Sequence, residues 1–376
     1  MVIREIQSSI EEKLFTGKII VIYGARQVGK TTLIQKIGEK YSDKHIYLNC
    51  DEPDIRELLA DATSTRLKNL VGQKTLVLID EAQRVKNIGI TLKLFADQMK
   101  DIQVIATGSS AFELSNEINE PLTGRKYEYT LYPFSMRELS NEFGWLETNR
   151  LLEERILYGM YPEIVLNPGE KKNLLKEITR SYLYKDLLSY QGIRKPEILE
   201  KLLIALASQI GSEVSFNELA GTIGIDKDTI SKYLNVLEKA FVIFRLLPFS
   251  RNIRTEITKM RKIYFFDTGI RNALISNFNS LTSRNDKGAL WENFLISEKL
   301  KMNFAINSDV KAYFWRSSQQ QEIDYIEERE SGLYVYEFSF NVNKKKKIPL
   351  TFSRAYNFKE SEIINSKNYG SFLGII

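Results

Sequence analysis

Residues 24–31 read Gly-Ala-Arg-Gln-Val-Gly-Lys-Thr and fit the phosphate-loop pattern G-x-x-x-x-G-K-[ST]. The apolar run Ile19–Tyr23 precedes them and Thr32–Ile37 follows with helical character, so the flanks predict a strand, a glycine-rich turn and a helix. In that context backbone N–H groups can surround an anion at the N-terminus of the helix. We therefore predict a nucleotide site on a parallel α/β sheet.

The residue types of this loop suit that role. Gly24 and Gly29 permit the tight turn and the close approach of the backbone. Lys30 would reach the β- and γ-phosphates, and Thr31 would ligate Mg²⁺. ATP and Mg²⁺ are therefore the expected cofactors. The predicted binding residues are Gly24, Ala25, Arg26, Gln27, Val28, Gly29, Lys30, Thr31 and Thr32.

Composition limits the remaining chemistry. With 376 residues the chain is long enough for about two to four domains. Cys50 is the only cysteine and His45 the only histidine, which excludes an intramolecular disulfide, a Cys/His zinc site and a Cys–His nucleophile pair. The formal charge of +5 is a weak indication of a polyanionic partner. Neither a transmembrane run nor a signal-peptide pattern stands out, so we expect a cytoplasmic protein without membrane contact.

A second apolar run, Thr75–Ile79, ends in the carboxylates of Asp80 and Glu81. This is the layout of a Walker B strand, in which Asp80 would hold Mg²⁺ through water and Glu81 would orient or deprotonate the attacking water. The alternative is a buried strand with acids at its exposed end. Glu81 is the residue that favours hydrolysis over binding alone.

The strand pattern Ile102–Ala106 ends in Thr107-Gly108-Ser109-Ser110. Short hydroxyl side chains at the carboxyl end of a parallel strand face the ligand crevice. We interpret the segment as a sensor-1 strand between the phosphate-loop strand and the Walker B strand, with Thr107 or Ser109 reporting on the γ-phosphate or the water. The alternative is a turn that happens to use these residues.

Periodicity predicts the neighbouring elements as well. We expect a helix over residues 3–16, a strand over His45–Cys50 and an acidic helix over residues 55–70. Gly124-Arg125 then leads into an alternating strand that ends near Phe134.

With these motifs the chain resembles the large family of bacterial and archaeal AAA+-type ATPases that join a phosphate-loop domain, a winged helix and a C-terminal domain long catalogued as of unknown function. The matching segments are the loop at 24–31, where the family usually has proline in place of Ala25, Asp80-Glu81, Thr107-Gly108-Ser109, Gly124-Arg125, Tyr132-Pro133-Phe134-Ser135 and Glu138. In AAA+-type rings an arginine near this strand enters the neighbouring subunit's site, and the resemblance assigns that role to Arg125 in a homo-oligomer. The alternative is a structural arginine paired with a nearby acid.

The pattern is helical from about Met136 to Gly192 and includes Gly159-Met160-Tyr161-Pro162-Glu163, which resembles the family's Gly-Gly-x-Pro-Glu segment except at Met160. We interpret this region as a helical lid. Arg180 and Lys185 could reach nucleotide, although solvated helix charges are the simpler reading.

Residues 198–237 predict three helices of helix-turn-helix layout, and 242–266 add two strands as a wing. Candidates for a major-groove face are Lys227, Thr229, Ser231, Lys232 and Tyr233, and candidates for phosphate contacts are Arg251, Arg254, Lys259, Arg261 and Lys262. Asp226 and Asp228 argue against DNA, because they place negative charge at the helix start. Packing against protein is therefore the alternative role.

The C-terminal residues resemble the PD-(D/E)xK nuclease fold, with Glu292 on a helix and Asp324 and Glu337 on strands in the metal positions. Ser339 stands where that motif has lysine, so cationic support for the reaction is lost unless the Lys344–Lys347 run supplies it. We expect a nuclease-like domain with little or no nuclease activity that holds DNA or a partner.

The sequence thus predicts an α/β protein with a phosphate-loop core at 1–135, a lid at 136–195, a winged helix at 196–285 and a restriction-endonuclease-like domain at 286–376. The expected function is Mg²⁺-dependent ATP hydrolysis, with Lys30, Glu81, Thr107 and Arg125 as catalytic residues and Thr31 and Asp80 as metal ligands. We expect this hydrolysis to be coupled to the binding or remodelling of DNA, including branched DNA. A nucleotide-gated switch acting on a protein partner is the second reading, and an ATP-coupled nuclease is the third.

Overall fold

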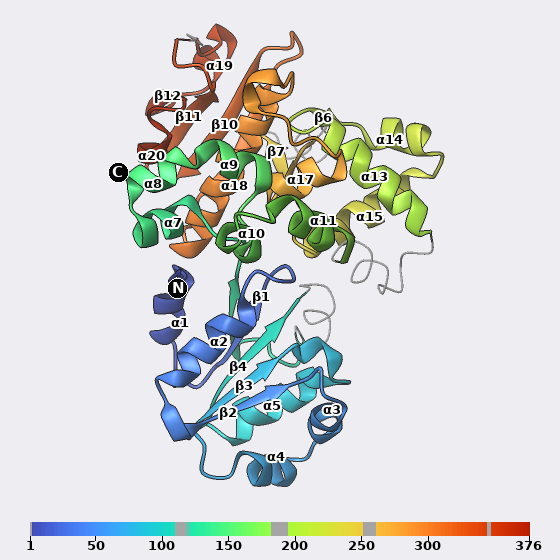
Figure 1. Ribbon diagram of the computed structural model, residues 1–376, viewed down its shortest axis with the longest axis vertical. Helices are drawn as coiled ribbons and strands as arrows, with labels where there is room; N and C mark the ends of the chain where they lie inside the picture. The colour runs from blue at the N-terminus through green and yellow to red at the C-terminus, as the bar shows by residue number, and fades with distance from the viewer. Residues whose placement is uncertain (1, 110–117, 119, 182–194, 251–260, 344–346) are drawn as a thin grey trace. The chain divides into compact units, whose positions relative to one another are not determined.

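The computed structural model describes residues 2–109, 118, 120–181, 195–250, 261–343 and 347–376 (Figure 1). These residues form two units, which we call the N-terminal unit (Met1–Phe134 with Lys239–Phe241) and the C-terminal unit (Ser135–Glu238 with Val242–Ile376). None of the described helices combines the length and the apolar character needed to cross a bilayer.

The N-terminal unit is built on a five-stranded sheet in the order β2-β3-β4-β1-β5, and every neighbouring pair of strands is parallel (Figure 1). The strands are β1 (Ile19–Tyr23), β2 (His45–Asn49), β3 (Leu76–Asp80), β4 (Gln103–Gly108) and β5 (Lys126–Thr130). All residues of β1, β3 and β4 are buried, as expected for apolar runs covered on both faces. The predicted α/β fold is confirmed, and β4 lies between β1 and β3.

The helices of this unit are α1 (Ile6–Glu11), α2 (Lys30–Glu39), α3 (Pro53–Leu59), α4 (Ser64–Val71) and α5 (Ile88–Gln98), with 3-10 turns η1 (Ser42–Lys44) and η2 (Ala82–Arg84). The single acidic helix predicted over residues 55–70 is wrong. Asp61 adopts a left-handed backbone with φ 48°, and the Thr63 side chain accepts a hydrogen bond from the Arg66 N–H, so α3 ends and α4 begins. The helix predicted over 3–16 is also shorter: α1 covers Ile6–Glu11, and the left-handed backbone of Phe15, with φ 59°, is incompatible with a helix that continues to residue 16.

The C-terminal unit contains most of the helices: α7 (Met136–Phe143), α8 (Trp145–Arg150), α9 (Leu152–Tyr158), α10 (Pro162–Leu166), α11 (Lys171–Ser181), α13 (Pro196–Ser208), α14 (Phe216–Ile223), α15 (Lys227–Lys239), α17 (Thr268–Leu274), η4 (Leu281–Ser283), α18 (Lys287–Ala305), α19 (Leu350–Ala355) and α20 (Tyr369–Phe372). The Ser135 hydroxyl and the Glu138 carboxylate form a reciprocal capping box at the start of α7.

A seven-stranded sheet in the order β12-β11-β10-β9-β7-β8-β6 forms the centre of this unit. Its strands are β6 (Glu213–Val214), β7 (Ile243–Pro248), β8 (Arg261–Phe265), β9 (Lys311–Arg316), β10 (Glu322–Arg329), β11 (Gly332–Phe338) and β12 (Glu360–Ile364). The parallel pairing of β7 with β9 joins the strands expected in a wing to those expected in a nuclease-like sheet. The four-part domain division, including the winged-helix and nuclease-like assignments, stays a prediction.

Asp267 ties the turn after α9 to the start of α17. Its carboxylate accepts the Met160 N–H at 2.7 Å and the N–H groups of Gly269 and Ile270 at 2.9 and 3.1 Å. Gly159 has φ 75°, and a Cβ there would lie 1.9 Å from the Asp267 carboxylate. The Gly159–Glu163 segment is therefore a packed junction that requires glycine at its first position.

Candidate nucleotide site

The loop between β1 and α2 has the backbone that its glycines imply. Gly29 is left-handed with φ 95° immediately before α2. A Cβ on Gly24 would lie 2.2 Å from the Leu131 backbone oxygen, which is too close for any side chain. The loop thus needs glycine at both positions, one for its conformation and the other for space.

Lys30 lies inside the loop and is 4% exposed. Its Nζ donates hydrogen bonds to the backbone oxygens of Gly24 at 3.0 Å and Ala25 at 2.9 Å. The ammonium is thereby held over the concave side of the loop, where an anion would compete with these carbonyl groups for it. Ala25 and Val28 are buried in the unit's core, Arg26 is half-buried, and Gln27 and Thr32 are exposed.

Arg4 supports the loop from outside, and sequence reasoning missed it. Its guanidinium donates to the Val28 oxygen at 2.7 Å and to the Tyr132 oxygen at 2.5 Å, and the residue is 8% exposed. Both acceptors are backbone atoms, so no pattern of side chains in the sequence indicates that Arg4 makes these contacts.

Asp80 is the centre of the polar contacts at the end of β3. The Thr31 hydroxyl donates to its Oδ2 at 2.6 Å, and the Tyr47 hydroxyl donates to the same atom at 2.9 Å. The Thr107 hydroxyl donates to Oδ1. A carboxylate beside a threonine hydroxyl is a set of hard oxygen ligands that suits Mg²⁺. The residues present therefore fit the expected metal.

Tyr47 was missed by the sequence analysis, because a tyrosine on an alternating strand reads as packing. Burial raises the pKa of its phenol, and the hydrogen bond to Asp80 and the charge of that carboxylate raise it further. The phenol therefore stays protonated and remains a donor to Asp80.

Glu81 follows Asp80 in a left-handed conformation with φ 52°, which is uncommon for a residue other than glycine. Its N–H donates to the Thr107 hydroxyl at 3.1 Å, and its Oε2 accepts a hydrogen bond from the Gln83 amide at 2.5 Å. Thr107 is fully buried and linked to both acidic residues, whereas Ser109 is half-buried. The structure thus brings together Lys30, Thr31, Asp80, Glu81 and Thr107.

Arg125 lies where the strands of this sheet begin, at the opposite end from the phosphate loop. Its backbone oxygen accepts the Ile19 N–H at the start of β1, whereas the phosphate loop follows the end of that strand, about 16 Å of chain away. Its Nε is 2.6 Å from Asp97 Oδ1, and both side chains are about two-fifths exposed, at 40% and 39%. Within one chain Arg125 therefore forms an ion pair with a nearby acid, which was the alternative to a role in a neighbouring subunit's site.

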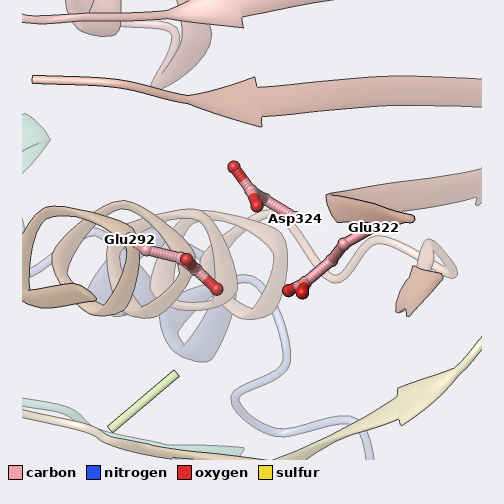
Figure 2. A group of neighbouring side chains, drawn as sticks. All are labelled: Glu292, Glu322 and Asp324. Atoms are coloured by element: carbon pink, nitrogen blue, oxygen red, sulfur yellow. The ribbon is translucent and has the colours of Figure 1, made fainter. Parts of the chain in front are cut away.

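A separate carboxylate cluster lies in the C-terminal unit. Figure 2 shows the Glu292 side chain extending from α18 towards Glu322 and Asp324, both on β10. One oxygen from each of the three lies within 4.8 Å of the others. The sequence analysis predicted Glu292, Asp324 and Glu337 as the metal ligands. Among the described residues, the group of neighbouring carboxylates contains Glu322 in place of Glu337. Glu322 and Asp324 are two residues apart on one strand and so share a face.

Lys262 occupies this cluster and is 1% exposed. Its Nζ donates to Glu292 Oε1 at 2.9 Å and forms an ion pair with Glu322, while the Tyr264 hydroxyl donates to Glu292 Oε1 at 2.5 Å. Burial lowers the pKa of the Lys262 amine, but the carboxylates of Glu292, Glu322 and Asp324 outweigh that effect and raise it above its ordinary value. A phosphate contact from Lys262 is therefore excluded, and that prediction was wrong.

The other residues predicted to contact DNA differ in how exposed their side chains are. Lys227 and Lys232 are exposed on α15, Thr229 and Ser231 are half-buried, and Tyr233 is 4% exposed, so Tyr233 belongs to the core. Asp226 accepts two hydrogen bonds from Thr229 and caps α15. Arg261 is half-buried and lies 6.0 Å over the Phe216 ring.

Other cations named from the sequence are placed only in part. Arg180 and Lys347 are exposed, and the Ser339 hydroxyl donates to the Asn341 backbone oxygen at 3.0 Å. The positions outside the described residues are Lys185, Arg251, Arg254, Lys259 and Lys344–Lys346.

Comparison with protein families matches three successive parts of the chain. Residues 16–140 are similar to a family described as "AAA domain". Residues 149–281 and 287–370 are each similar to a domain of unknown function, DUF8612 and DUF4143 respectively.

Two uncharacterized proteins from different organisms are similar over most of this chain. An uncharacterized protein of Methanocaldococcus jannaschii is 29% identical over 367 residues, covering 91% of this chain and 80% of the relative. An uncharacterized protein of Mycobacterium tuberculosis is 27% identical over 342 residues, covering 89% and 73%.

Among solved structures, a Walker-type ATPase of Pyrococcus abyssi aligns with a TM-score of 0.50 at 16% identity, covering 73% of this chain and 96% of that chain. The five-stranded parallel sheet, its phosphate loop and the AAA-domain match together show that the N-terminal unit has the fold of a Walker-type P-loop ATPase.

Proposed function

We propose that the N-terminal unit hydrolyses ATP with Mg²⁺. The observation that carries this proposal is the hydrogen bond of 2.6 Å from Thr31 to Asp80, which brings together two oxygen ligands beside the loop that holds Lys30. Lys30 would bind the phosphates, Thr31 and Asp80 would hold the metal, and Glu81 would take the proton of the attacking water. A bound Mg²⁺ would neutralise charge on the phosphates.

The test is ATP turnover of the purified chain in Mg²⁺, with Lys30→Ala as the blank. We expect turnover in the wild type and loss of nucleotide binding in the variant, because removing the buried ammonium leaves the phosphates without their cation. Equal turnover in both proteins would contradict the assignment. Gln98→Met, an exposed substitution on α5 in the same unit, is the control for nonspecific effects.

We further propose that hydrolysis is coupled to DNA, and that Lys227 and Lys232 on α15 contact the phosphate backbone. Support comes from their exposure and from the net charge of +5. Turnover measured with single-stranded, duplex and four-way-junction DNA tests the coupling, and we expect one form to stimulate it. Replacing both lysines with alanine should reduce the salt dependence of DNA binding.

The second candidate is a nucleotide-gated switch that acts on a protein partner. Burial of Tyr233 and Lys262 and the Asp226 cap on α15 favour it, because they reduce the surface left for a nucleic acid. An ATP turnover rate that none of the DNA forms changes would favour this candidate.

We propose that the carboxylate cluster of the C-terminal unit is not a nuclease centre. The Lys262 ammonium pairs directly with Glu292 and Glu322, so it already offsets part of the negative charge that would attract a divalent ion and competes for the same carboxylates. Supercoiled DNA incubated with the protein and Mg²⁺ or Mn²⁺ should remain intact. A nick that Asp324→Ala abolishes would overturn this proposal and select the ATP-coupled nuclease.

A further inference from the structure

Arg4 connects the phosphate loop with the part of the chain that follows β5. Its guanidinium donates to the Val28 oxygen in the loop at 2.7 Å and to the Tyr132 oxygen at 2.5 Å. The same group lies over the Phe134 ring, 5.0 Å from its centroid. A planar guanidinium with two hydrogen bonds and an aromatic ring against its face has little freedom to move. Arg4 therefore offers the Val28 oxygen a donor of fixed position.

The Val28 oxygen belongs to the peptide group that Val28 shares with Gly29. No peptide bond among the described residues is cis, so the Val28 C=O and the Gly29 N–H point in opposite directions. Because the C=O is directed at Arg4, the Gly29 N–H points away from Arg4. Gly29 is partly exposed and directly precedes α2, so its N–H adjoins the N–H groups that begin this helix. These groups are the ones that bind an anion in a phosphate loop.

The residues around this peptide group differ in how firmly they are held. Val28 is 0% exposed and Lys30 is 4% exposed, so packing holds the chain on both sides of Gly29. Gly29 has φ 95° and no side chain, so rotation about its φ and the Val28 ψ can turn the peptide group over without moving a side chain. That rotation would direct the Val28 oxygen at the anion and withdraw the Gly29 N–H. The hydrogen bond from Arg4 opposes it.

We propose that Arg4 is a positioning residue for the phosphates of the bound nucleotide, because by holding the Val28 oxygen it keeps the Gly29 N–H directed at them. The role rests on the nucleotide binding of the proposed function. Arg4 acts through the backbone of the loop, whereas Lys30 remains the cation for the phosphates. The Gly29 N–H serves ATP and ADP alike, since both nucleotides carry the β-phosphate that Lys30 is predicted to reach.

The test is Arg4→Met, which keeps an unbranched side chain and removes both hydrogen bonds. We expect the Kd for ATP and the Kd for ADP each to rise by about tenfold, because a hydrogen bond to a charged group is weakened in both complexes. The KM for ATP should rise with them while kcat at saturating ATP stays within about twofold, since binding is lost equally before and in the transition state. Arg4→Lys keeps the charge but lacks the planar fork, so its Kd values should lie between those of the other two proteins. It also keeps the test available where Arg4→Met does not fold.

Two controls on α4 separate positioning of the loop from a loss of stability. Arg66→Met removes an exposed guanidinium that also donates to a backbone oxygen, that of Glu57 at 2.9 Å, and should bind ATP as wild type does. Leu67 is 0% exposed, so Leu67→Ala leaves a cavity and should lower the Tm of the N-terminal unit. Measured well below that Tm, its Kd for ATP should equal that of the wild type.

Three results would overturn the role of Arg4: unchanged Kd values in folded Arg4→Met, a loss confined to kcat, or an equal loss of affinity in Leu67→Ala. A wild type that binds ATP without turning it over would overturn the proposed hydrolysis alone, because the two Kd values still decide the role of Arg4. A wild type that binds neither nucleotide would overturn both proposals.

Discussion

Replacing Lys262 with methionine should destabilise the C-terminal unit strongly. The side chain is 1% exposed, and its loss removes the ammonium paired with Glu292 and Glu322, although Glu322 keeps a longer contact of 3.9 Å to Arg316. Breaking a buried ion pair by removing one partner costs about 3–5 kcal/mol. Glu322 is 29% exposed and is partly solvated, so we take the lower end, about 3 kcal/mol.

The assay is thermal unfolding in EDTA, monitored through a signal that reports on the C-terminal unit. For a unit of this size 1 kcal/mol shifts Tm by about 2–4 °C, so Lys262→Met should melt about 6–12 °C lower. Lys347→Met, at an exposed lysine of the same unit, is the control and should melt as wild type. The charge of Lys262 is retained well above neutral pH, because its folded pKa is raised, so the shift should be constant between about pH 6 and 9.

Neutralising the acids should reverse the effect. Adding Glu292→Gln and Glu322→Gln to Lys262→Met removes the uncompensated charges and should restore most of the lost stability. Mn²⁺ should raise the Tm of Lys262→Met and leave the wild type unchanged, because three carboxylate oxygens within 4.8 Å of one another then no longer have the Lys262 ammonium between them. A single variant as stable as wild type, or a nucleotide-free wild type that binds Mn²⁺ through Glu292, would refute the reasoning.

Three further predictions concern other contacts. Tyr47→Phe removes one donor to Asp80 and should raise the Mg²⁺ concentration for half-maximal turnover by about tenfold; an unchanged Mg²⁺ titration would contradict this. Asp286→Asn should cost about 2 kcal/mol at neutral pH, because Arg271 and Arg284 are buried on that carboxylate. Hydrogen bonds from Arg284 and Arg271 lower the folded pKa of Asp286 to about 2, so in urea unfolding this difference should persist above about pH 4 and vanish as the pH falls towards 2. If Arg125 acts in a neighbouring subunit, mixing inactive Lys30→Ala and Arg125→Ala proteins should restore turnover, and a mixture as inactive as its parts would leave Arg125 with the Asp97 pair.

The sequence predicted the phosphate loop and its two flanking elements because all three are local. An apolar run, two glycines and a helix start determine the backbone between Ile19 and Ile37 with little help from the rest of the chain. The acidic residues at the end of β3 were equally predictable from the sequence, because Asp80 and Glu81 follow an uninterrupted apolar run. These positions are where local preference and the tertiary fold agree.

Lys262 was misjudged because its partners are remote in the chain. Glu292 lies 30 residues away, and Glu322 lies on a strand that reaches β8 only through the intervening β9 and β7. One signal was present: Lys262 and Tyr264 alternate with Arg261 on a strand, which places the lysine and the tyrosine on one face.

Gln83 and Arg4 show two further limits. The spacing of Gln83 from Glu81 was visible in the sequence, but the hydrogen bond from its amide to Ser109, at the end of another strand, was not. Arg4 donates to the backbone oxygens of Val28 and Tyr132, and such contacts leave no trace in side-chain patterns. Long-range hydrogen bonds of this kind follow from the fold and could not be predicted before it.

The most direct test of the account is to compare Glu81→Gln with the wild type in two measurements on the same preparations, ATP turnover in Mg²⁺ and the Kd for ATP. We expect the variant to bind ATP with wild-type affinity and to lose turnover by at least about 10²-fold, because the amide cannot take the water proton. Wild-type turnover in Glu81→Gln would contradict the assigned chemistry, and turnover lacking in both proteins would contradict the proposed ATPase itself.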